Sequence, residues 1–288
     1  MSETLHCPKR GQFEEMKPVG GKGMKNRRLS GVTAMGCMLF AAAVAAVGAE
    51  ASREPQAGDV TTITLPGGAT MEMVWCPAGT FLMGSGHDEH PVTLTKGFWM
   101  GKYEVTRAQW KSVMGKEPSD GWGDNLPVVY VTWDDCQQFC RKAGLSLPTE
   151  AQWEYACRAG SRGPYAGTGN LDDMGWYDGN SGLKTHPVGM KQPNAWGIYD
   201  MHGNVWEWCA DWYDSYPDGA VTDPEGSLSG LASFFGGEGS SSEWNRVLRG
   251  GCWGSFAPLC TSVYRLDQPP SQAESGVGFR PVRNLPEE

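Results

Sequence analysis

Two cysteines, eight positions apart, are the residues of this sequence best placed to do chemistry. Cys252 and Cys260 lie in the stretch RGGCWGSFAPLCTSVYR, which covers residues 249–265. Two thiols so close in the sequence could be a working site or the remains of one. Two thiols can also form a disulfide in an exported protein, or stay protonated as small core residues. The residue types alone leave these alternatives open, and with them the choice between an enzyme and a binding module.

A second group of chemically suggestive residues is a set of carboxylates among tryptophans. The stretch NAWGIYDMHGNVWEWCADWY, residues 194–213, contains Asp200, Glu207 and Asp211. A carboxylate beside bulky aromatic side chains needs a partner for its charge. A hard cation such as Ca²⁺, held by Asp200, Glu207 and backbone carbonyls, would supply one. Hydrogen bonds from turn amides would serve equally well, and the spacing does not choose between the two.

Short β-strands and capped helices are expected to position these residues. Five β-type runs are separated by Pro-Gly turns, at residues 61–65, 71–76, 80–83, 92–94 and 98–100. Three helices should follow, each beginning at a threonine with Gln or Asp three residues later, which is a capping box. These pairs are Thr106 with Gln109, Thr132 with Asp135, and Thr149 with Gln152; left-handed caps are expected at Gly115, Gly144 and Gly160.

The later part of the chain carries few regular signals. On the second helix, Cys136 and Cys140 share one face and are expected in the core. After residue 161 the helix signals vanish, a Gly/Ser-rich insert occupies residues 218–243, and two β-type segments follow at 246–249 and 277–282. The histidines His90, His186 and His202 are not spaced as a zinc set and are expected to make loop hydrogen bonds.

Composition and the N-terminus narrow the class of protein. The 288 residues carry a net charge of -9, and no basic patch follows the first thirty residues, so nucleic acid is excluded as a partner. Residues 24–51 combine Lys25, Arg27 and Arg28 with an apolar run and small residues, which predicts a signal peptide. We therefore expect a secreted or periplasmic protein without a membrane anchor after cleavage. Residues 1–23 are interpreted as an N-terminal extension or a start assigned too early.

Several separate motifs resemble those of the formylglycine-generating enzyme family, the sulfatase-modifying-factor domains. They occur in the family's order and cover nearly all of the mature chain: Met83-Gly84-Ser85, Glu104-Val105-Thr106, Leu147-Pro148-Thr149-Glu150, His186-Pro187-Val188, Gly203-Asn204-Val205-Trp206-Glu207-Trp208, Arg249-Gly250-Gly251 and Gly278-Phe279-Arg280. The resemblance implies an α+β, C-type-lectin-like single domain over residues 61–284, after a linker at 52–60. Such a domain has a small antiparallel sheet, flanking helices and long irregular loops tied down by calcium.

The resemblance also assigns calcium ligands. The family's ligands fall on Asp200, the carbonyls of Gly203 and Val205, and Glu207. A second calcium site of the family would use Asn180 and nearby carbonyls. By this resemblance the carboxylates among the tryptophans are expected to bind calcium.

At the catalytic position the sequence departs from the family. In the family's oxidases, cysteines three and eight positions after a serine bind Cu(I), and O₂ then oxidises a protein cysteine to formylglycine. Here Cys252 stands at the serine, Cys260 matches the second cysteine, and Ser255 replaces the first. A hydroxyl is a poor Cu(I) ligand. Cys252 would therefore have to replace the missing thiolate, or else the site is inert, or the loop serves binding.

Relatives of this domain include the variable proteins of diversity-generating retroelements, which vary the corresponding loop. That loop here comprises Gly254, Ser255, Phe256, Pro258 and Leu259, and exposed Phe and Leu would form a contact patch. We expect a calcium-stabilised module that binds a protein or peptide ligand. The alternative is a copper- and O₂-dependent oxidase acting on a protein cysteine, with Cys252 and Cys260 as its ligands.

Overall fold

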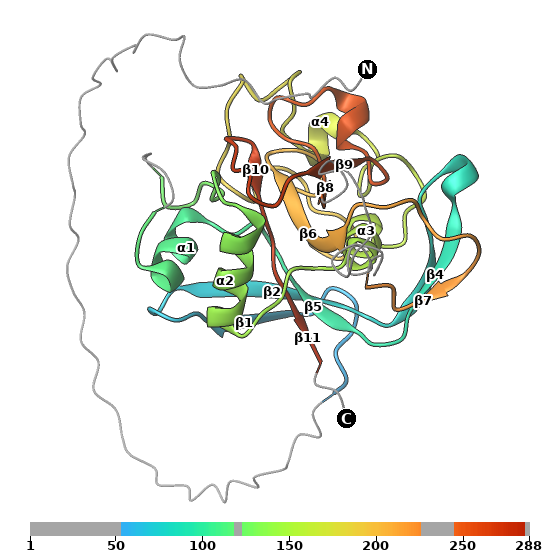
Figure 1. The fold of residues 1–288 in the computed structure, drawn as a ribbon, viewed down its shortest axis with the longest axis horizontal. Coiled ribbons are helices and arrows are strands. Elements are labelled where there is room, and N and C mark those ends of the chain that lie inside the picture. Colours follow the sequence, from blue (N-terminus) through green and yellow to red (C-terminus); the bar gives the residue numbers. More distant parts are fainter. Residues whose placement is uncertain (1–52, 118–122, 226–244, 286–288) are drawn as a thin grey trace, which may run out of the picture. The chain divides into compact units, whose positions relative to one another are not determined.

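A computed structural model describes residues 53–117, 123–225 and 245–285 (Figure 1). The predicted signal peptide and residues 226–243 of the Gly/Ser insert lie outside these ranges. Within them, no helix has both the length and the apolar character needed to cross a bilayer.

The described strands form three small sheets. The first is antiparallel, in the order β1 (Val60–Thr64), β2 (Thr70–Cys76), β5 (Phe98–Gly101) and β11 (Val282–Asn284). The second has the order β10 (Val277–Gly278), β6 (Trp206–Trp212), β8 (Arg246–Arg249) and β9 (Arg265–Gln268), with β10 parallel to β6. The third has the order β3 (Gly79–Met83), β4 (His90–Leu94) and β7 (Val221–Thr222), with β7 parallel to β4.

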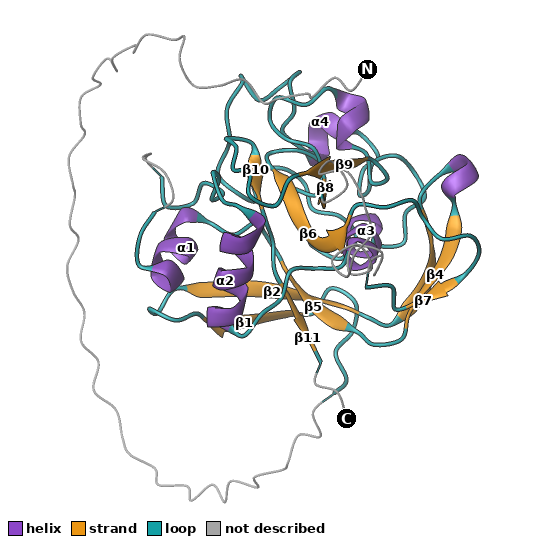
Figure 2. Cartoon of the chain, viewed as in Figure 1, coloured by secondary structure: helices purple, strands orange, loops and turns teal. Residues whose placement is uncertain are grey.

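Helices flank these sheets, and loops make up much of the rest (Figure 2). The α-helices are α1 (Arg107–Met114), α2 (Trp133–Ala143), α3 (Glu150–Arg158) and α4 (Leu171–Met174). Two short 3₁₀ turns cover Gly86–Asp88 and Ala257–Cys260. Figure 1 shows α1 and α2 beside one another and next to β1 and β2, while α3 contacts β3, β6 and β8. The predicted α+β fold class is confirmed, although the second and third sheets each contain a parallel pair of strands.

The predicted helix signals are confirmed with one correction. All three capping boxes form, including the one that uses Asp135. Helices α1 and α2 end at Gly115 and Gly144 in the left-handed conformation. Helix α3 ends one residue earlier than predicted, because Ala159 takes the left-handed position with φ 43° and Gly160 follows it.

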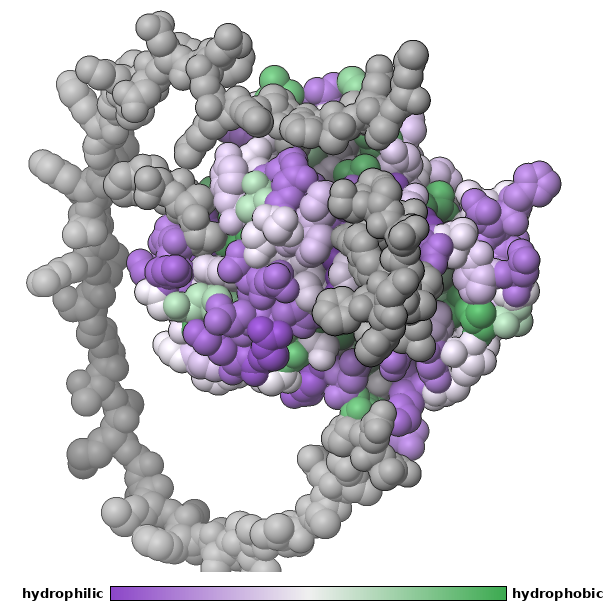
Figure 3. Space-filling model, in the orientation of Figure 1, coloured by the Kyte–Doolittle hydropathy of each residue, from purple (hydrophilic) through white to green (hydrophobic). Residues whose placement is uncertain are grey.

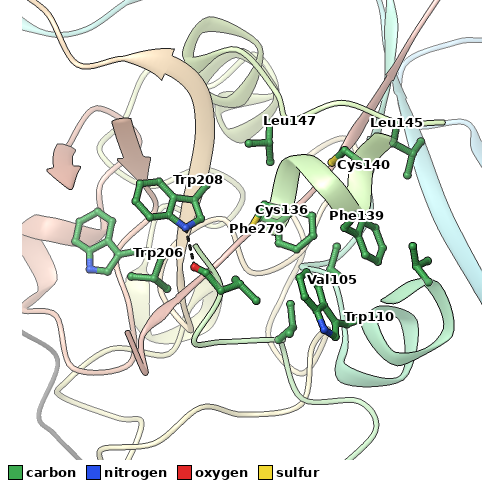
Figure 4. Packing of buried hydrophobic residues seen from close by; sticks show 14 of the residues in the cluster. Val105, Trp110, Cys136, Phe139, Cys140, Leu145, Leu147, Trp206, Trp208 and Phe279 are labelled. Carbon is green, nitrogen blue, oxygen red and sulfur yellow. Dashed lines mark hydrogen bonds between the residues drawn. The ribbon is translucent and has the colours of Figure 1, made fainter. Parts of the chain in front are cut away.

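The core packs the helices against the sheets through aromatic side chains (Figure 4). The ring centroid of Phe139 lies 5.7 Å from that of Trp110 and 5.3 Å from that of Phe279. Cys136 and Cys140 are fully buried in the same cluster, as predicted. The indole nitrogen of Trp208 donates to the carbonyl of Val131 over 3.1 Å. On the face of the molecule drawn in Figure 3, the described surface is mostly hydrophilic, with hydrophobic residues in small separate groups.

Candidate functional site

The two cysteines lie in a loop, residues 250–263, that connects β8 to β9; we call it the binding loop. The loop begins with Gly250 and Gly251, at φ 94° and 82°. A Cβ atom added to Gly251 would lie 2.5 Å from the sulfur of Cys260 and 3.0 Å from its Cα. Only glycine permits this contact, which brings the start of the loop against its end.

Arg249 closes the base of the binding loop. This fully buried guanidinium donates to the carbonyls of Ser262, over 2.7 Å, and Val263, over 3.0 Å. It also pairs with Glu150 and Glu154 of α3. The last residue of β8 therefore holds the far end of the loop, and α3 holds that residue in place.

Other carbonyls of the loop are held by groups outside it. Four donors and the carbonyls that they reach are Ser181 Oγ to Trp253 at 2.6 Å, Asp178 N to Ser255 at 3.0 Å, Tyr165 Oη to Ala257 at 2.8 Å, and His202 Nδ1 to Cys260 at 2.8 Å. The loop backbone is therefore fixed by groups that do not include its own exposed side chains.

His202 is one of these holding groups, and its hydrogen bonds define its protonation. Its Nε2 accepts from the amide of Ala166 over 2.9 Å, so Nδ1 must carry the proton that reaches the carbonyl of Cys260. Burial lowers the pKa of His202 to about 4, and the imidazole is neutral at physiological pH. The predicted loop hydrogen bonding of His202 is confirmed, as it is for His90 and His186, which bond backbone carbonyls.

The cysteine pair is buried and engaged in packing. Cys252 is 2% exposed and Cys260 is 0% exposed. Ser255 sits beside Cys252: its hydroxyl accepts from the Cys252 amide over 2.9 Å and lies 3.4 Å from the Cys252 sulfur. Burial, with the nearby Cys252 thiol as the second cause, raises the pKa of Cys260. The site thus offers two buried thiols and a hydroxyl already used in a turn, which is not the two-thiolate donor set of the oxidases.

The predicted ligand-contact positions divide into exposed and buried ones. Phe256 is 59% exposed and Pro258 is also exposed. Gly254 is half-buried, and Leu259 is partly buried against the core. Ser255 is only 5% exposed and faces Cys252, so its side chain is a structural part of the loop.

Two of the carboxylates among the tryptophans, Asp200 and Glu207, form an acidic cluster with Glu104 around the guanidinium of Arg280, whereas Asp211 accepts from the Glu150 amide over 2.7 Å. Both oxygens of Glu207 accept from Arg280, over 2.7–3.0 Å, and one also accepts from the Trp153 indole over 2.7 Å. Glu104 accepts from the Asn204 side chain over 2.6 Å and the Val205 amide over 3.1 Å. All these charged groups are buried.

Asp200 is the member of the acidic cluster that has an oxygen atom available for a further partner. Its Oδ2 accepts from the Gly189 amide over 2.7 Å, whereas its buried Oδ1 has no hydrogen-bond partner among the described residues. Burial raises the pKa of Asp200 to about 6. Burial, followed by the charges of Asp200 and Glu207, raises the pKa of Glu104 well above its usual range. Three carboxylates share one guanidinium, so the cluster carries excess negative charge whenever all three are ionised.

The fit of this cluster to calcium is partial. Asp200 Oδ1 is available to a cation, but the oxygens of Glu207 already face Arg280 and Trp153. Within the described ranges, no three His, Cys, Asp or Glu side chains are arranged to hold a metal ion. An ion at Asp200 would therefore depend on backbone carbonyls such as those of Gly203 and Val205. The Gly203 backbone is tightly placed, since an added Cβ would lie 2.2 Å from the Trp176 carbonyl oxygen.

At the second predicted calcium position, both ends of the Asn180 side chain are already engaged in hydrogen bonds. The side-chain oxygen of Asn180 accepts from the Tyr177 amide over 3.0 Å, and its amide nitrogen donates to the Gly175 carbonyl over 3.0 Å. Both ends of this side chain close the local turn. The second calcium site stays a prediction.

Sequence reasoning missed the residues that hold the site together. Arg249 and Glu150 lie in recognised motifs without an assigned role, and Ser181 and Tyr165 lie in a stretch without regular signals. The available hint was the charge itself, because Arg and Glu inside otherwise apolar motifs must pair with each other once buried.

Replacing Arg249 with methionine is expected to lower the free energy of unfolding by about 3–5 kcal/mol, because Glu150 and Glu154 lose a buried partner. Amide hydrogen exchange of residues 250–263 should accelerate, since two loop carbonyls lose their donor. Arg265→Met is the matched control: Arg265 also pairs with Glu150, but it donates to the carbonyl of Asp214, outside the loop. Equal loop protection in both variants would contradict the clamp assigned to Arg249.

Comparison with known proteins places the chain in a family. The family model for the sulfatase-modifying factor enzyme 1-like domain matches residues 63–285. The formylglycine-generating enzyme of Streptomyces coelicolor is 34% identical over 198 residues, which cover 61% of this chain and 58% of that enzyme. The chain thus spans little more than half of that relative's length.

Solved structures agree with this placement. Treponema denticola variable protein 1 is 28% identical, with a TM-score of 0.67 over 77% of this chain and 98% of that one. PvdO from Pseudomonas aeruginosa is 27% identical, with a TM-score of 0.62 over 81% of this chain and 100% of that one. The chain therefore belongs to the sulfatase-modifying-factor family, whose members include the formylglycine-generating enzymes, and it has the C-type-lectin-like fold of that family.

Proposed function

We propose that this domain is a binding module that presents the exposed side chains of the binding loop to a protein or peptide ligand. The observation that carries the proposal is that the loop backbone is held by other residues while some of its side chains remain exposed. Its backbone is held by Arg249, Tyr165, Ser181 and His202, whereas the side chain of Phe256 is 59% exposed to solvent. The likeness to a variable protein of Treponema denticola supports the same function.

A fixed backbone with exposed side chains is suited to recognition. A loop that is already ordered loses little conformational entropy when it binds, so more of the contact energy appears as affinity. An exposed aromatic ring is also the type of residue that anchors protein interfaces. Variation at positions 254, 256 and 258 would then change which ligand is bound without disturbing the fold, as a variable protein of a diversity-generating retroelement requires.

We also propose that the domain works outside the cytoplasm, because residues 24–51 have the pattern of a signal peptide.

The second candidate function is the copper oxidase, and one observation supports it. The thiols of Cys252 and Cys260 are close enough for one to raise the pKa of the other. Against this function, Ser255 supplies a hydroxyl where the oxidases supply a thiolate, and that hydroxyl is engaged with Cys252. If copper were bound, Cys252 and Cys260 would be the ligands that hold it.

We also propose calcium as a stabilising ion at Asp200. A cation there is supported by the excess negative charge of the acidic cluster and by Asp200 Oδ1, which has no hydrogen-bond partner in the described part of the chain. The carbonyls of Gly203 and Val205 would complete the site, and Glu207 would act mainly by holding Arg280.

The exposed ring of the binding loop should contribute nothing to the fold. Phe256→Ala is expected to change the free energy of unfolding by less than about 0.5 kcal/mol. Phe139→Ala, which removes a fully buried ring, should cost about 3–5 kcal/mol. Urea unfolding measures both. A loss of about 2 kcal/mol or more in Phe256→Ala would mean that the ring belongs to the core, and the display proposal would fail.

Copper binding separates the two candidate functions. The reduced protein should release Cu(I) to a chromogenic chelator, whereas Ser255→Cys, which restores the missing thiol, should retain about one ion per chain. Cys136→Ser controls for binding by other buried thiols. Retention of one Cu(I) by the unaltered chain, abolished by Cys260→Ser, would instead favour the oxidase.

Calcium at about a hundred times its Kd should raise the melting temperature by roughly 5–10 °C. Asp200→Ala should abolish the rise, and Asp218→Ala, at an exposed acid, should not. Differential scanning fluorimetry with calcium and then with a chelator measures the shift. An unchanged melting temperature in both conditions would remove the calcium proposal and leave the acidic cluster to Arg280 alone.

A further inference from the structure

A second segment lies alongside the binding loop at the surface. Residues 177–183, which we call the companion turn, are joined to the loop by two hydrogen bonds: from the Asp178 amide to the Ser255 carbonyl and from the Ser181 hydroxyl to the Trp253 carbonyl. The same hydroxyl accepts from the Leu183 amide over 3.1 Å. The two segments are thus held in one fixed arrangement, although they are about seventy residues apart in sequence.

Leu183 of the companion turn is exposed and conformationally costly. Its side chain is 49% exposed, and its backbone is left-handed with φ 59°. A left-handed leucine costs roughly 1–2 kcal/mol compared with the right-handed form, and glycine or asparagine would avoid most of that cost. Only about half of the side chain is buried in return, so leucine at this position destabilises the fold relative to glycine or asparagine. An apolar side chain held in this way is typical of a contact site.

Around Phe256 of the binding loop and Leu183 of the companion turn, exposed carboxylates outnumber lysines by three to two. Asp178 lies in the companion turn, and Asp172 and Asp173 lie in α4; all three are exposed. The Tyr177 hydroxyl donates to Asp172 over 2.8 Å and so links α4 to the companion turn. Two lysines lie in the same region: Lys184, which is exposed and follows Leu183, and Lys191, whose ammonium lies over the Trp176 ring and donates to the Asp172 carbonyl over 2.5 Å.

We infer that the binding loop and the companion turn form one contact surface, and that its partner is a basic polypeptide segment. Phe256 and Leu183 would receive an apolar side chain of the partner, and Asp172, Asp173 and Asp178 would face its lysines or arginines. A second copy of this chain is disfavoured as the partner, since like-charged surfaces repel and the whole chain carries a net charge of -9. This inference rests on the proposed binding function and adds the second segment and the charge of the ligand.

The test is a selection of random twelve-residue peptides on the immobilised full chain. Peptides that combine Lys or Arg with an aliphatic or aromatic residue should be enriched. The Kd of an enriched peptide, measured by fluorescence anisotropy, should be at least about tenfold lower than that of its twin with Glu at each basic position. Its affinity should also fall as salt concentration rises.

Variants locate the surface. Phe256→Ala and Leu183→Ala should each weaken binding about tenfold, and Asp178→Lys should weaken it about threefold or more. Val60→Ala, at another exposed apolar residue, and Asp218→Lys, at another exposed acid, are the matched controls and should leave the Kd unchanged. Melting temperatures of all variants establish that each chain is folded.

The outcomes distinguish this inference from the function on which it rests. Loss of binding in the Phe256, Leu183 and Asp178 variants, with basic peptides enriched, supports both. Enrichment of acidic or neutral peptides, or weakening by Phe256→Ala without any effect of Leu183→Ala, overturns the inference and leaves the loop as a binding site. Binding that ignores Phe256→Ala, or no enrichment at all, overturns both.

Discussion

The buried guanidinium of Arg249 is the interaction on which the site depends. It joins α3, the end of β8 and the far end of the binding loop through two carboxylates and two carbonyls. A charge taken so far from water is tolerable only if its carboxylate partners are in place. The loop conformation is therefore tied to the formation of the core rather than to local turn preferences. This link explains how a long irregular segment keeps one shape.

Charge pairing is used a second time, in the acidic cluster. Arg280 follows the short strand β10 and holds Glu207 of β6, while Glu104 secures the turn at Asn204 and Val205. In both places a guanidinium organises backbone that no regular hydrogen-bond ladder could hold. A fold with many loops and short strands needs such fixed points, because loop backbone must still satisfy its polar groups.

Much of the fold could be predicted from the sequence, and the reasons for the failures are physical. Capping boxes are local, so Thr106, Thr132 and Thr149 predicted three helix starts correctly. Strand β6 was not predicted, because its residues are buried on both faces and show no alternation. The exposure of the binding loop was predicted only in part: Phe256 is exposed as expected, whereas Ser255 turns inward. Long-range pairings such as Arg249 with Ser262 have no sequence periodicity that could reveal them.

The antiparallel pairing of β8 with β9 has a consequence for altering this domain. The two strands remain in register up to Arg249 opposite Arg265, so the binding loop is the connection of a hairpin. Its carbonyls meet donors that stand at fixed places on three other segments. Adding or deleting one residue would move every later carbonyl away from its donor, while exchanging an outward side chain would move none. As a scaffold for engineered recognition, the domain should therefore accept substitutions at the exposed positions of this loop, but not insertions or deletions that change its length.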